Sequence, residues 1–188
     1  MLRGAVAIAA LALAAHGGGA AALELAGVRV PEAASVAGHS LALNGAGVRT
    51  RLLFKVYVAS LYVPHKVTSV DAVLASPTRR VRLDLLRHLR AEQLVGALQD
   101  GLTDNNPPDA LAAIRPEVDA LEQVMRSLGD VPERSVITLD YADGATVIAQ
   151  DGVPRGSIPG DAFNQALLRI WLGDHPVQAN LRQAMLGE

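Results

Sequence analysis

An apolar stretch of the sequence, LNGAGVRTRLLFKVYVASLYVP at residues 43–64, carries side chains that could bind an anion: Arg49, Arg51, Lys55, Tyr57 and Tyr62. An arginine guanidinium presents a planar fork of donors that matches a carboxylate, and a tyrosine hydroxyl can donate a further hydrogen bond. A cleft walled by leucine and valine with few polar anchors holds an acyl chain or flat aromatic rings. The stretch therefore predicts a site for a small amphipathic or aromatic ligand with an anionic or oxygen-rich end.

Whether these side chains converge depends on the path of the chain. Side chains alternate along a strand, so one unbroken strand over residues 48–63 would place Arg49, Lys55 and Tyr57 on one face. At about 3.3 Å per residue, Arg49 and Tyr57 would then lie roughly 26 Å apart, too far to hold one small group. They can meet only if the chain folds back between residues 50 and 53, and nothing in the sequence TRLLF demands a turn.

A structural role is the alternative for each of these residues. Arg49 could bond loop carbonyls, and Tyr57 could belong to the core with its hydroxyl at the rim. The stem of Lys55 could pack while its amine reaches solvent. Tyr62 is expected on the face opposite Tyr57. Trp171 is expected to pack the last helices onto the sheet rather than to touch a ligand.

Other catalytic patterns are weak. The chain has no cysteine, and none of its five histidines pairs with another at metal-ligand spacing, so we expect no metal site and no cofactor. There is no G-x-S-x-G sequence, and GAGVRT at residues 45–50 lacks both the Walker lysine and the full dinucleotide pattern. Asp140, Asp143 and Asp151 do not have the spacing of a calcium-binding loop and are interpreted as turn residues.

The first 22 residues, MLRGAVAIAALALAAHGGGAAA, have the pattern of a secretory signal peptide. One cation precedes a short apolar run, and small residues follow it. The apolar run is shorter than the roughly 20 residues that span a bilayer, although an uncleaved anchor is the alternative. We predict cleavage after Ala22, export to a bacterial periplasm, and a mature chain that cannot use disulfides.

Residues 23–188 are predicted to form one domain, because no linker or internal repeat divides them. No second hydrophobic run reaches membrane length, so no membrane span is expected after signal cleavage. A formal net charge of −2 gives no reason to expect nucleic-acid binding. The sequence identifies no protein partner.

The order of the predicted elements favours an α+β fold. Early strands are expected at 24–30, 39–50, 54–63 and 79–89, with a short helix at 69–76. Helices follow at 90–102 and 109–128, the second kinked or split by Pro116. Three short strands joined at Asp143-Gly144 and Asp151-Gly152 come next, and a helical pair closes the chain at 161–172 and 177–186. Such an order predicts an antiparallel sheet with helices over one face.

Nearly all of residues 23–188 resembles the chalcone isomerase-like family, in its bacterial exported branch. The resemblance rests on GAGVRT at 45–50, FKVYVASLYVP at 54–64, LDYADGATVIAQDGVPRGSIPGDAF at 139–163 and ALLRIWLGDHPVQANLRQAMLG at 166–187. It implies an open-faced β-sandwich, in which a large antiparallel sheet carries a layer of helices and the ligand cleft lies between them. In the enzymes, an arginine after the glycine-rich turn steadies the substrate oxygens. Arg49 is similar to it, and Tyr57 stands where the enzymes have a threonine.

The same resemblance implies three missing polar partners. The enzymes carry a tyrosine and an asparagine on the central helix, where this sequence has Leu94 and Gly101, and a hydroxyl residue near the end, where it has Ile170. Chalcone cyclisation would lose most of its oriented donors. In the fatty-acid-binding branch, an arginine and a tyrosine hold the carboxylate, which suits Arg49 and Tyr57.

We therefore predict a periplasmic, non-catalytic binder of a fatty acid or similar small amphipathic carboxylate. Arg49 would pair with the carboxylate, Tyr57 would donate a hydrogen bond, and Lys55 would supply additional positive charge. Two alternatives stay open. One is a cofactor-free intramolecular lyase or isomerase of a chalcone-like enone that uses Arg49 and Tyr57. The other is a structural or partner-binding module with a filled cleft and an exposed apolar patch.

Overall fold

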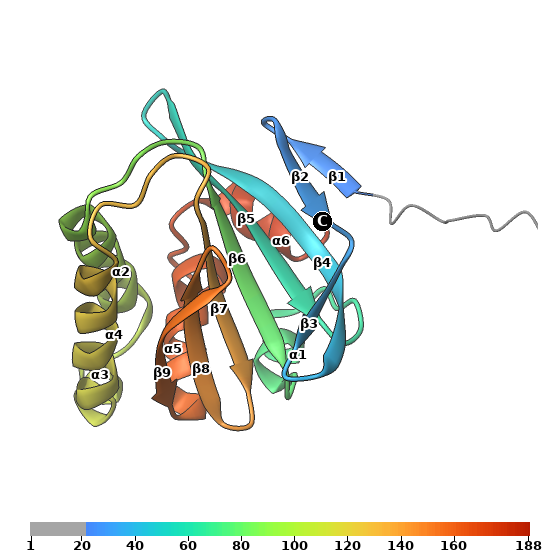
Figure 1. Cartoon of the computed structure of the whole chain (residues 1–188). Helices are drawn as coiled ribbons and strands as arrows, with labels where there is room; N and C mark the ends of the chain where they lie inside the picture. The colour runs from blue at the N-terminus through green and yellow to red at the C-terminus, as the bar shows by residue number, and fades with distance from the viewer. Residues whose placement is uncertain (1–21) are drawn as a thin grey trace, which may run out of the picture.

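The computed structural model describes residues 22–188 and is built on a seven-stranded antiparallel sheet in which each strand pairs with its neighbours in sequence (Figure 1). The predicted signal peptide, except its last residue, lies outside the described residues. The strands are β3 (Ala33–Val36), β4 (His39–Arg51), β5 (Phe54–Val63), β6 (Arg79–Leu85), β7 (Val136–Ala142), β8 (Ala145–Gln150) and β9 (Val153–Pro159).

Helices cover one face of this sheet, and the main hydrophobic core lies between the two layers. The helices are α1 (Val70–Ala75), α2 (Ala91–Asn105), α3 (Pro108–Ala113), α4 (Arg115–Leu128), α5 (Asp161–Leu172) and α6 (Ala179–Met185). The break between α3 and α4 falls at Ile114, next to Pro116, as the sequence predicts. The arrangement confirms the predicted α+β class and the antiparallel sheet with a helical layer.

A small hairpin packs on the other face of the sheet. The segment that we expected to be one strand at 24–30 is two, β1 (Ala22–Leu25) and β2 (Val28–Pro31), because the chain turns between them. Val30 forms a second buried cluster with Val58 and Tyr62 of β5. The Tyr62 hydroxyl donates to the Pro31 carbonyl at 2.9 Å, so Tyr62 lies on the predicted face with a structural role.

The glycines of the GAG sequence allow α6 to pack closely against β4. A Cβ at Gly45 would collide with the carbonyl oxygen of Ala184, and one at Gly47 would lie 2.9 Å from the Leu181 Cδ1 atom. Their function in this fold is close packing of helix on strand. This packing also fixes the loop before α6 beside the end of β4 that carries Arg49.

Candidate functional site

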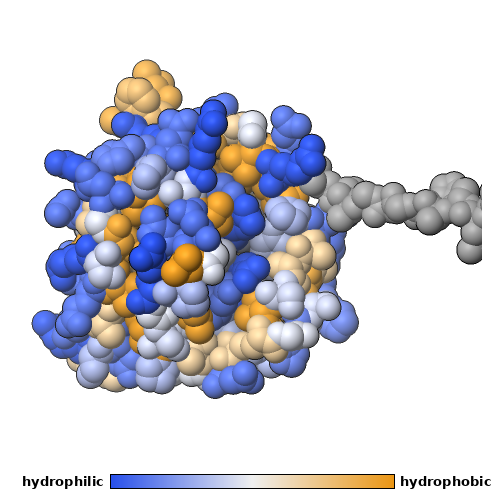
Figure 2. All heavy atoms as spheres, in the orientation of Figure 1, coloured by the Kyte–Doolittle hydropathy of each residue, from blue (hydrophilic) through white to orange (hydrophobic). Residues whose placement is uncertain are grey.

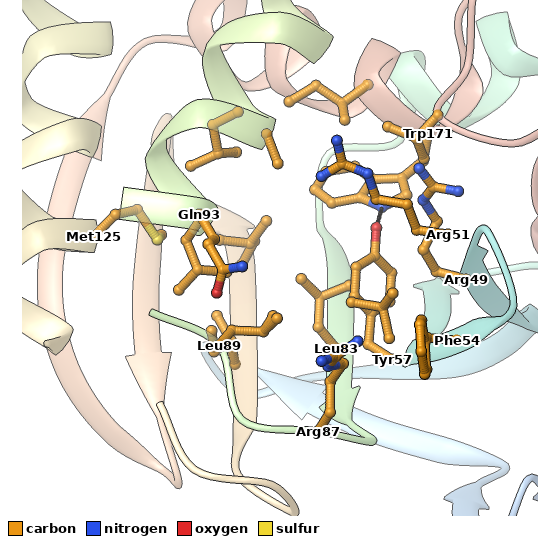
Figure 3. A pocket seen from close by; sticks show the side chains of 18 of the residues that line it. Arg49, Arg51, Phe54, Tyr57, Leu83, Arg87, Leu89, Gln93, Met125 and Trp171 are labelled. Atoms are coloured by element: carbon orange, nitrogen blue, oxygen red, sulfur yellow. Dashed lines mark hydrogen bonds between the residues drawn. The ribbon is translucent and has the colours of Figure 1, made fainter. Parts of the chain in front are cut away.

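A cavity of about 270 Å³ lies between the sheet and the helices (Figure 3). Helix α2 packs mainly against α4 and α5, and the cavity separates it from the strands. The volume is near the lower end of the range for small-molecule sites, about 300–1,000 Å³. The lining residues are Arg49, Arg51, Leu52, Phe54, Val56, Tyr57, Leu83, Arg87, Leu89, Gln93, Leu94, Ala97, Leu98, Met125, Ile137, Leu139, Ile170, Trp171 and Val177.

The wall of this cavity is mostly apolar, and its charged groups are all cations. Three arginines line it, at positions 49, 51 and 87, and no carboxylate among the described residues does. Arg49, Arg51 and Tyr57 lie on one side of the cavity in Figure 3, and Leu89, Gln93 and Met125 lie on the other. The cavity therefore suits a ligand with an anionic end and an apolar body.

A hairpin brings Arg49 and Tyr57 together. The chain reverses at Leu52 and Leu53, where β4 ends and β5 begins, so the unbroken strand considered from the sequence is wrong. Arg49 and Tyr57 are direct cross-strand partners in the antiparallel register. Residues directly opposite one another have their Cβ atoms about 5 Å apart. The two side chains thus converge on the cavity.

A β-bulge explains why Lys55 is placed elsewhere. Arg49 pairs with Tyr57 but Thr50 pairs with Lys55, which leaves Val56 as an extra residue in β5. A bulge of this kind shifts the alternation of side chains by one position. Val56 and Tyr57 both line the cavity, whereas Lys55 is exposed and is not among the lining residues. The expectation that Lys55 shares a face with Arg49 and Tyr57 is therefore wrong.

Arg49 is half-buried and is held in place by the loop before α6. Its Nη1 donates to the Thr50 carbonyl at 2.6 Å and to Gln178 Oε1 at 3.2 Å. Gln178 also accepts from the Thr50 backbone N–H at 2.8 Å and donates to the Val48 carbonyl at 3.1 Å. The carbonyl contact expected of a structural arginine is present. Burial raises the pKa of Tyr57, and a hydrogen bond from the Arg49 side chain offsets part of that effect. Thr50 and Gln178 engage only Nη1, so the guanidinium, with five N–H donors, keeps donors for a ligand.

Tyr57 has an uncommitted proton. Trp171 Nε1 donates to the Tyr57 hydroxyl at 3.1 Å, and an indole N–H can only donate, so the phenol oxygen accepts in this pair. Burial raises the pKa of the Tyr57 phenol, and the Trp171 hydrogen bond and the nearby charge of Arg49 offset only part of that effect. The phenol therefore stays protonated near neutral pH and can donate its hydrogen into the cavity.

The three positions at which the resemblance implies lost polar groups are apolar in space as well. Leu94 and Ile170 both line the cavity. Gly101 faces Ile170, whose Cγ2 atom would lie 2.8 Å from a Cβ at that position. These positions contribute packing between α2 and α5 and apolar wall, and they offer no hydrogen-bond donor to a substrate.

Sequence reasoning missed several residues that belong to the site. Arg51 was noted in the apolar stretch but received no role, and Arg87 and Gln93, which also line the cavity, were not singled out. Trp171 was expected to pack the last helices rather than to touch a ligand; it is buried in the core and also lines the cavity. Gln178 lies outside the lining and acts on it through Arg49. Alternation along β4 places Arg51 on the same face as Arg49, so Arg51 could have been found. The other four come from a loop and from helix ends, where no periodic pattern marks a ligand-facing side chain.

Two other kinds of site are absent from the described part of the chain. No group of three or more histidine or acidic side chains is placed to hold a metal ion within residues 22–188. Over the same residues, no helix combines the length and the hydrophobicity needed to cross a bilayer.

The fold and the site together define a class of protein in which helices cover one face of an antiparallel sheet. Between the two layers lies a cavity with a mostly apolar wall and a few arginines. The chalcone isomerase-like family model matches residues 22–187, and the chain belongs to that family. A fatty-acid binding protein of Arabidopsis thaliana has a similar structure, with a TM-score of 0.64 and 17% identity over 85% of this chain and 92% of that one. This likeness confirms the predicted chalcone isomerase-like fold. Comparison with curated proteins gave no significant match.

Proposed function

We propose that this protein binds a fatty acid or a similar small amphipathic carboxylate without turning it over. The observation that carries the proposal is the pairing of Arg49 with Tyr57 at a cationic region of an otherwise apolar cavity. The guanidinium takes the carboxylate through N–H groups that Thr50 and Gln178 do not engage. The Tyr57 phenol donates a second hydrogen bond to the same carboxylate. Leu83, Leu94 and Leu98 surround the acyl chain.

Two further facts support a lipid-like ligand. The cavity lining of the described residues has three cations and no carboxylate, so an anion meets no like charge there. The similar structure from Arabidopsis thaliana is a fatty-acid binding protein by its own description. At 17% identity that likeness shows the fold alone, so the ligand class rests on the site residues of this chain.

The decisive experiment compares ligand binding by wild type, Arg49→Ala and Lys55→Ala. The chain has one tryptophan, Trp171, and it lines the cavity, so intrinsic fluorescence can follow a fatty-acid titration. A hydrogen bond to a charged group contributes roughly 1.5–3 kcal/mol, so Arg49→Ala should weaken binding about tenfold to 100-fold. Lys55→Ala removes an exposed cation beside the cavity and should change affinity by less than about twofold.

Two results would contradict the binding role. Equal effects of the two substitutions would mean that general positive charge, and not the Arg49 site, attracts the ligand. Loss of a chalcone's absorbance in the presence of wild type, abolished by Arg49→Ala, would favour the isomerase alternative. Native mass spectrometry of protein taken from its host under mild conditions should also show a fatty-acid adduct.

We also propose that the protein belongs to the bacterial exported branch of the family and acts in the periplasm. The support is the charged, apolar and small-residue order of residues 1–22. Fractionation of the host should find a shortened chain that starts at Leu23 in the periplasmic fraction. A full-length chain in the cytoplasm would overturn the assignment.

A further inference from the structure

The β4–β5 hairpin ends in three consecutive large apolar side chains that point into solvent. Leu52 is 89% exposed, Leu53 is 94% exposed and Phe54 is 60% exposed. Figure 2 shows an apolar projection at the upper left, at the place where this turn lies in Figure 1. Single exposed apolar residues are ordinary on protein surfaces, but a contiguous group on a protruding turn points to a binding surface.

The sequence of this turn is unusual among the two-residue turns of the described chain. Four of them place a glycine second, with both residues at positive φ, as type I′ turns favour: Ala26-Gly27, Ala37-Gly38, Asp143-Gly144 and Asp151-Gly152. The β4–β5 turn instead has Leu52 at φ +56°, a backbone conformation that disfavours a Cβ, followed by Leu53. Turn geometry therefore does not explain why leucine occupies these two positions.

Cations surround the apolar tip. Arg51 and Lys55 flank it in the hairpin, and the Arg87 guanidinium lies 5.1 Å from the centre of the Phe54 ring. All three cations are exposed, and none forms an ion pair within residues 22–188. The surface of an anionic bilayer suits this arrangement, because apolar side chains can insert among the lipid chains while the surrounding cations contact the lipid phosphates.

The tip is also the mouth of the cavity. Arg51, Leu52, Phe54 and Arg87 are exposed and line the cavity at the same time. A membrane that accepts Leu52 and Phe54 would therefore face the opening that leads to Arg49 and Tyr57. A soluble amphipathic acid would not require an apolar entrance of this kind, whereas a lipid taken from a bilayer would.

We propose that the Leu52-Leu53-Phe54 tip, with its collar of Arg51, Lys55 and Arg87, docks on the surface of an anionic lipid bilayer and opens the cavity toward it. Docking itself is independent of the proposed ligand. Transfer of an amphipathic acid between membrane and cavity rests on the proposed binding function. Failure of docking and failure of ligand binding are separable, because the first is measured with vesicles and the second with fatty acid in solution.

The test compares the wild-type protein, purified as its host processes it, with the variant Leu53→Asn. Leu53 is 94% exposed, is not among the cavity-lining residues and, unlike Leu52, is not at positive φ, so asparagine removes the most exposed apolar side chain of the tip while keeping the hairpin and the cavity. We expect sedimentation with phosphatidylglycerol vesicles to fall at least tenfold in the variant, and Trp171-detected fatty-acid binding to change less than twofold. A matched variant, Val153→Ser, removes an exposed apolar residue from the β8–β9 hairpin, which β6 and β7 separate from the β4–β5 hairpin, and should sediment like wild type.

Because all variants share one N-terminus, membrane affinity that residues 1–22 contribute would be equal in each. A direct readout uses the absence of cysteine: an environment-sensitive fluorophore on Leu53→Cys should shift to shorter wavelength with phosphatidylglycerol vesicles. The same label on Val153→Cys should not shift. Equal sedimentation of wild type and Leu53→Asn, or an unshifted label at position 53, overturns the proposal. Self-association through the tip without vesicle binding would also overturn it, in favour of a second copy of the chain.

Discussion

At the scale of single residues, the site depends on which groups donate hydrogen bonds to the Tyr57 oxygen. The Trp171 indole can only donate, so it occupies a lone pair of the phenol oxygen and leaves the phenol hydrogen for a ligand. Arg49 is held in a similar way, because Gln178 and the Thr50 carbonyl engage one edge of the guanidinium. In the proposed binding function, Arg49 and Tyr57 are thus oriented before a ligand arrives, which would lower the entropic cost of binding.

Tyr57→Phe should weaken ligand binding while leaving the cavity shape intact. The substitution removes one hydrogen bond to the charged carboxylate, worth roughly 1.5–3 kcal/mol, so affinity should fall about tenfold to 100-fold. It also leaves the buried Trp171 N–H without its acceptor, which should lower the free energy of unfolding by about 1–3 kcal/mol. Isothermal titration with fatty acid and urea unfolding measure the two effects. Unchanged affinity would show that the phenol does not touch the ligand.

Tyr57 should also make stability sensitive to alkaline pH. Burial raises the pKa of the folded phenol above its unfolded value near 10, so its contribution is complete below about pH 10 and is lost as pH rises through the folded pKa. Urea unfolding between pH 8 and pH 11 should show this loss. The loss of stability should be smaller in Tyr57→Phe. Part of the loss should remain, because burial also raises the pKa of Tyr62.

At the scale of elements, hairpins decide which side chains meet. The β7–β8 and β8–β9 turns contain Asp-Gly and were predicted from sequence. The β4–β5 turn contains Leu-Leu, which carries no turn signal, so the strand break that unites Arg49 and Tyr57 could not be read from local sequence. The bulge at Val56 has no sequence signal either, and it moved Lys55 away from the site.

The close approach of α6 to β4 gives a prediction about glycine. Gly45→Ala should destabilise the fold by about 1–3 kcal/mol, since its Cβ would overlap the Ala184 carbonyl oxygen and the backbone of α6 would have to move. Gly96→Ala is the matched control. Its Cβ would meet nothing within 4 Å in the interior of α2, and alanine there should stabilise the protein by about 0.5–1 kcal/mol. Thermal unfolding of both variants checks the opposite signs, and two losses of similar size would contradict the packing argument.

At the scale of the whole molecule, a buried arginine connects the sheet to α5 at the end away from the cavity. Arg79 of β6 is 2% exposed, and it donates to Asn164 at 2.7 Å and to Asp161 at 2.9 Å. Its guanidinium also lies 4.1 Å from the centre of the Tyr141 ring. Every partner is part of the fold, so this arginine is structural, in contrast to Arg49.

This network predicts how the molecule responds to acid. Burial acts to raise the pKa of Asp161, but the hydrogen bonds from Arg79 and Tyr141 outweigh it and lower the pKa. The contribution of this carboxylate is therefore present above its unfolded pKa near 4 and is lost as pH falls through the lower folded value. Asp161→Asn should be less stable than wild type at pH 7, and the difference should shrink below about pH 4. Urea unfolding at pH 7 and pH 3 measures it, and a difference independent of pH would rule out the ion pair as the cause.

The order of elements along the chain was enough to predict the α+β class and the helix-covered antiparallel sheet, because strand and helix patterns are clear in residues 54–63, 109–128 and 136–159. The chalcone isomerase-like fold itself was predicted from the family resemblance. The cavity was harder to predict. Its existence depends on α2 resting on α4 and α5 at a distance from the strands, which is a property of helix packing and not of any one segment. A ligand-binding role for Arg49 was suggested by its residue type and by the family resemblance. That Arg49 lies beside Tyr57 could be seen only in the structure.

The β4–β5 hairpin carries both Arg49 and Tyr57, which are proposed to bind the ligand, and the exposed turn residues at the opening of the cavity. Under the two proposals, ligand recognition and ligand entry depend on one contiguous segment, the nine residues from Arg49 to Tyr57. Transferring that segment to a relative with the same fold should transfer the preference for the charged group of the ligand. It should not alter the part of the cavity that holds the apolar chain of the ligand, because other strands and helices line that part.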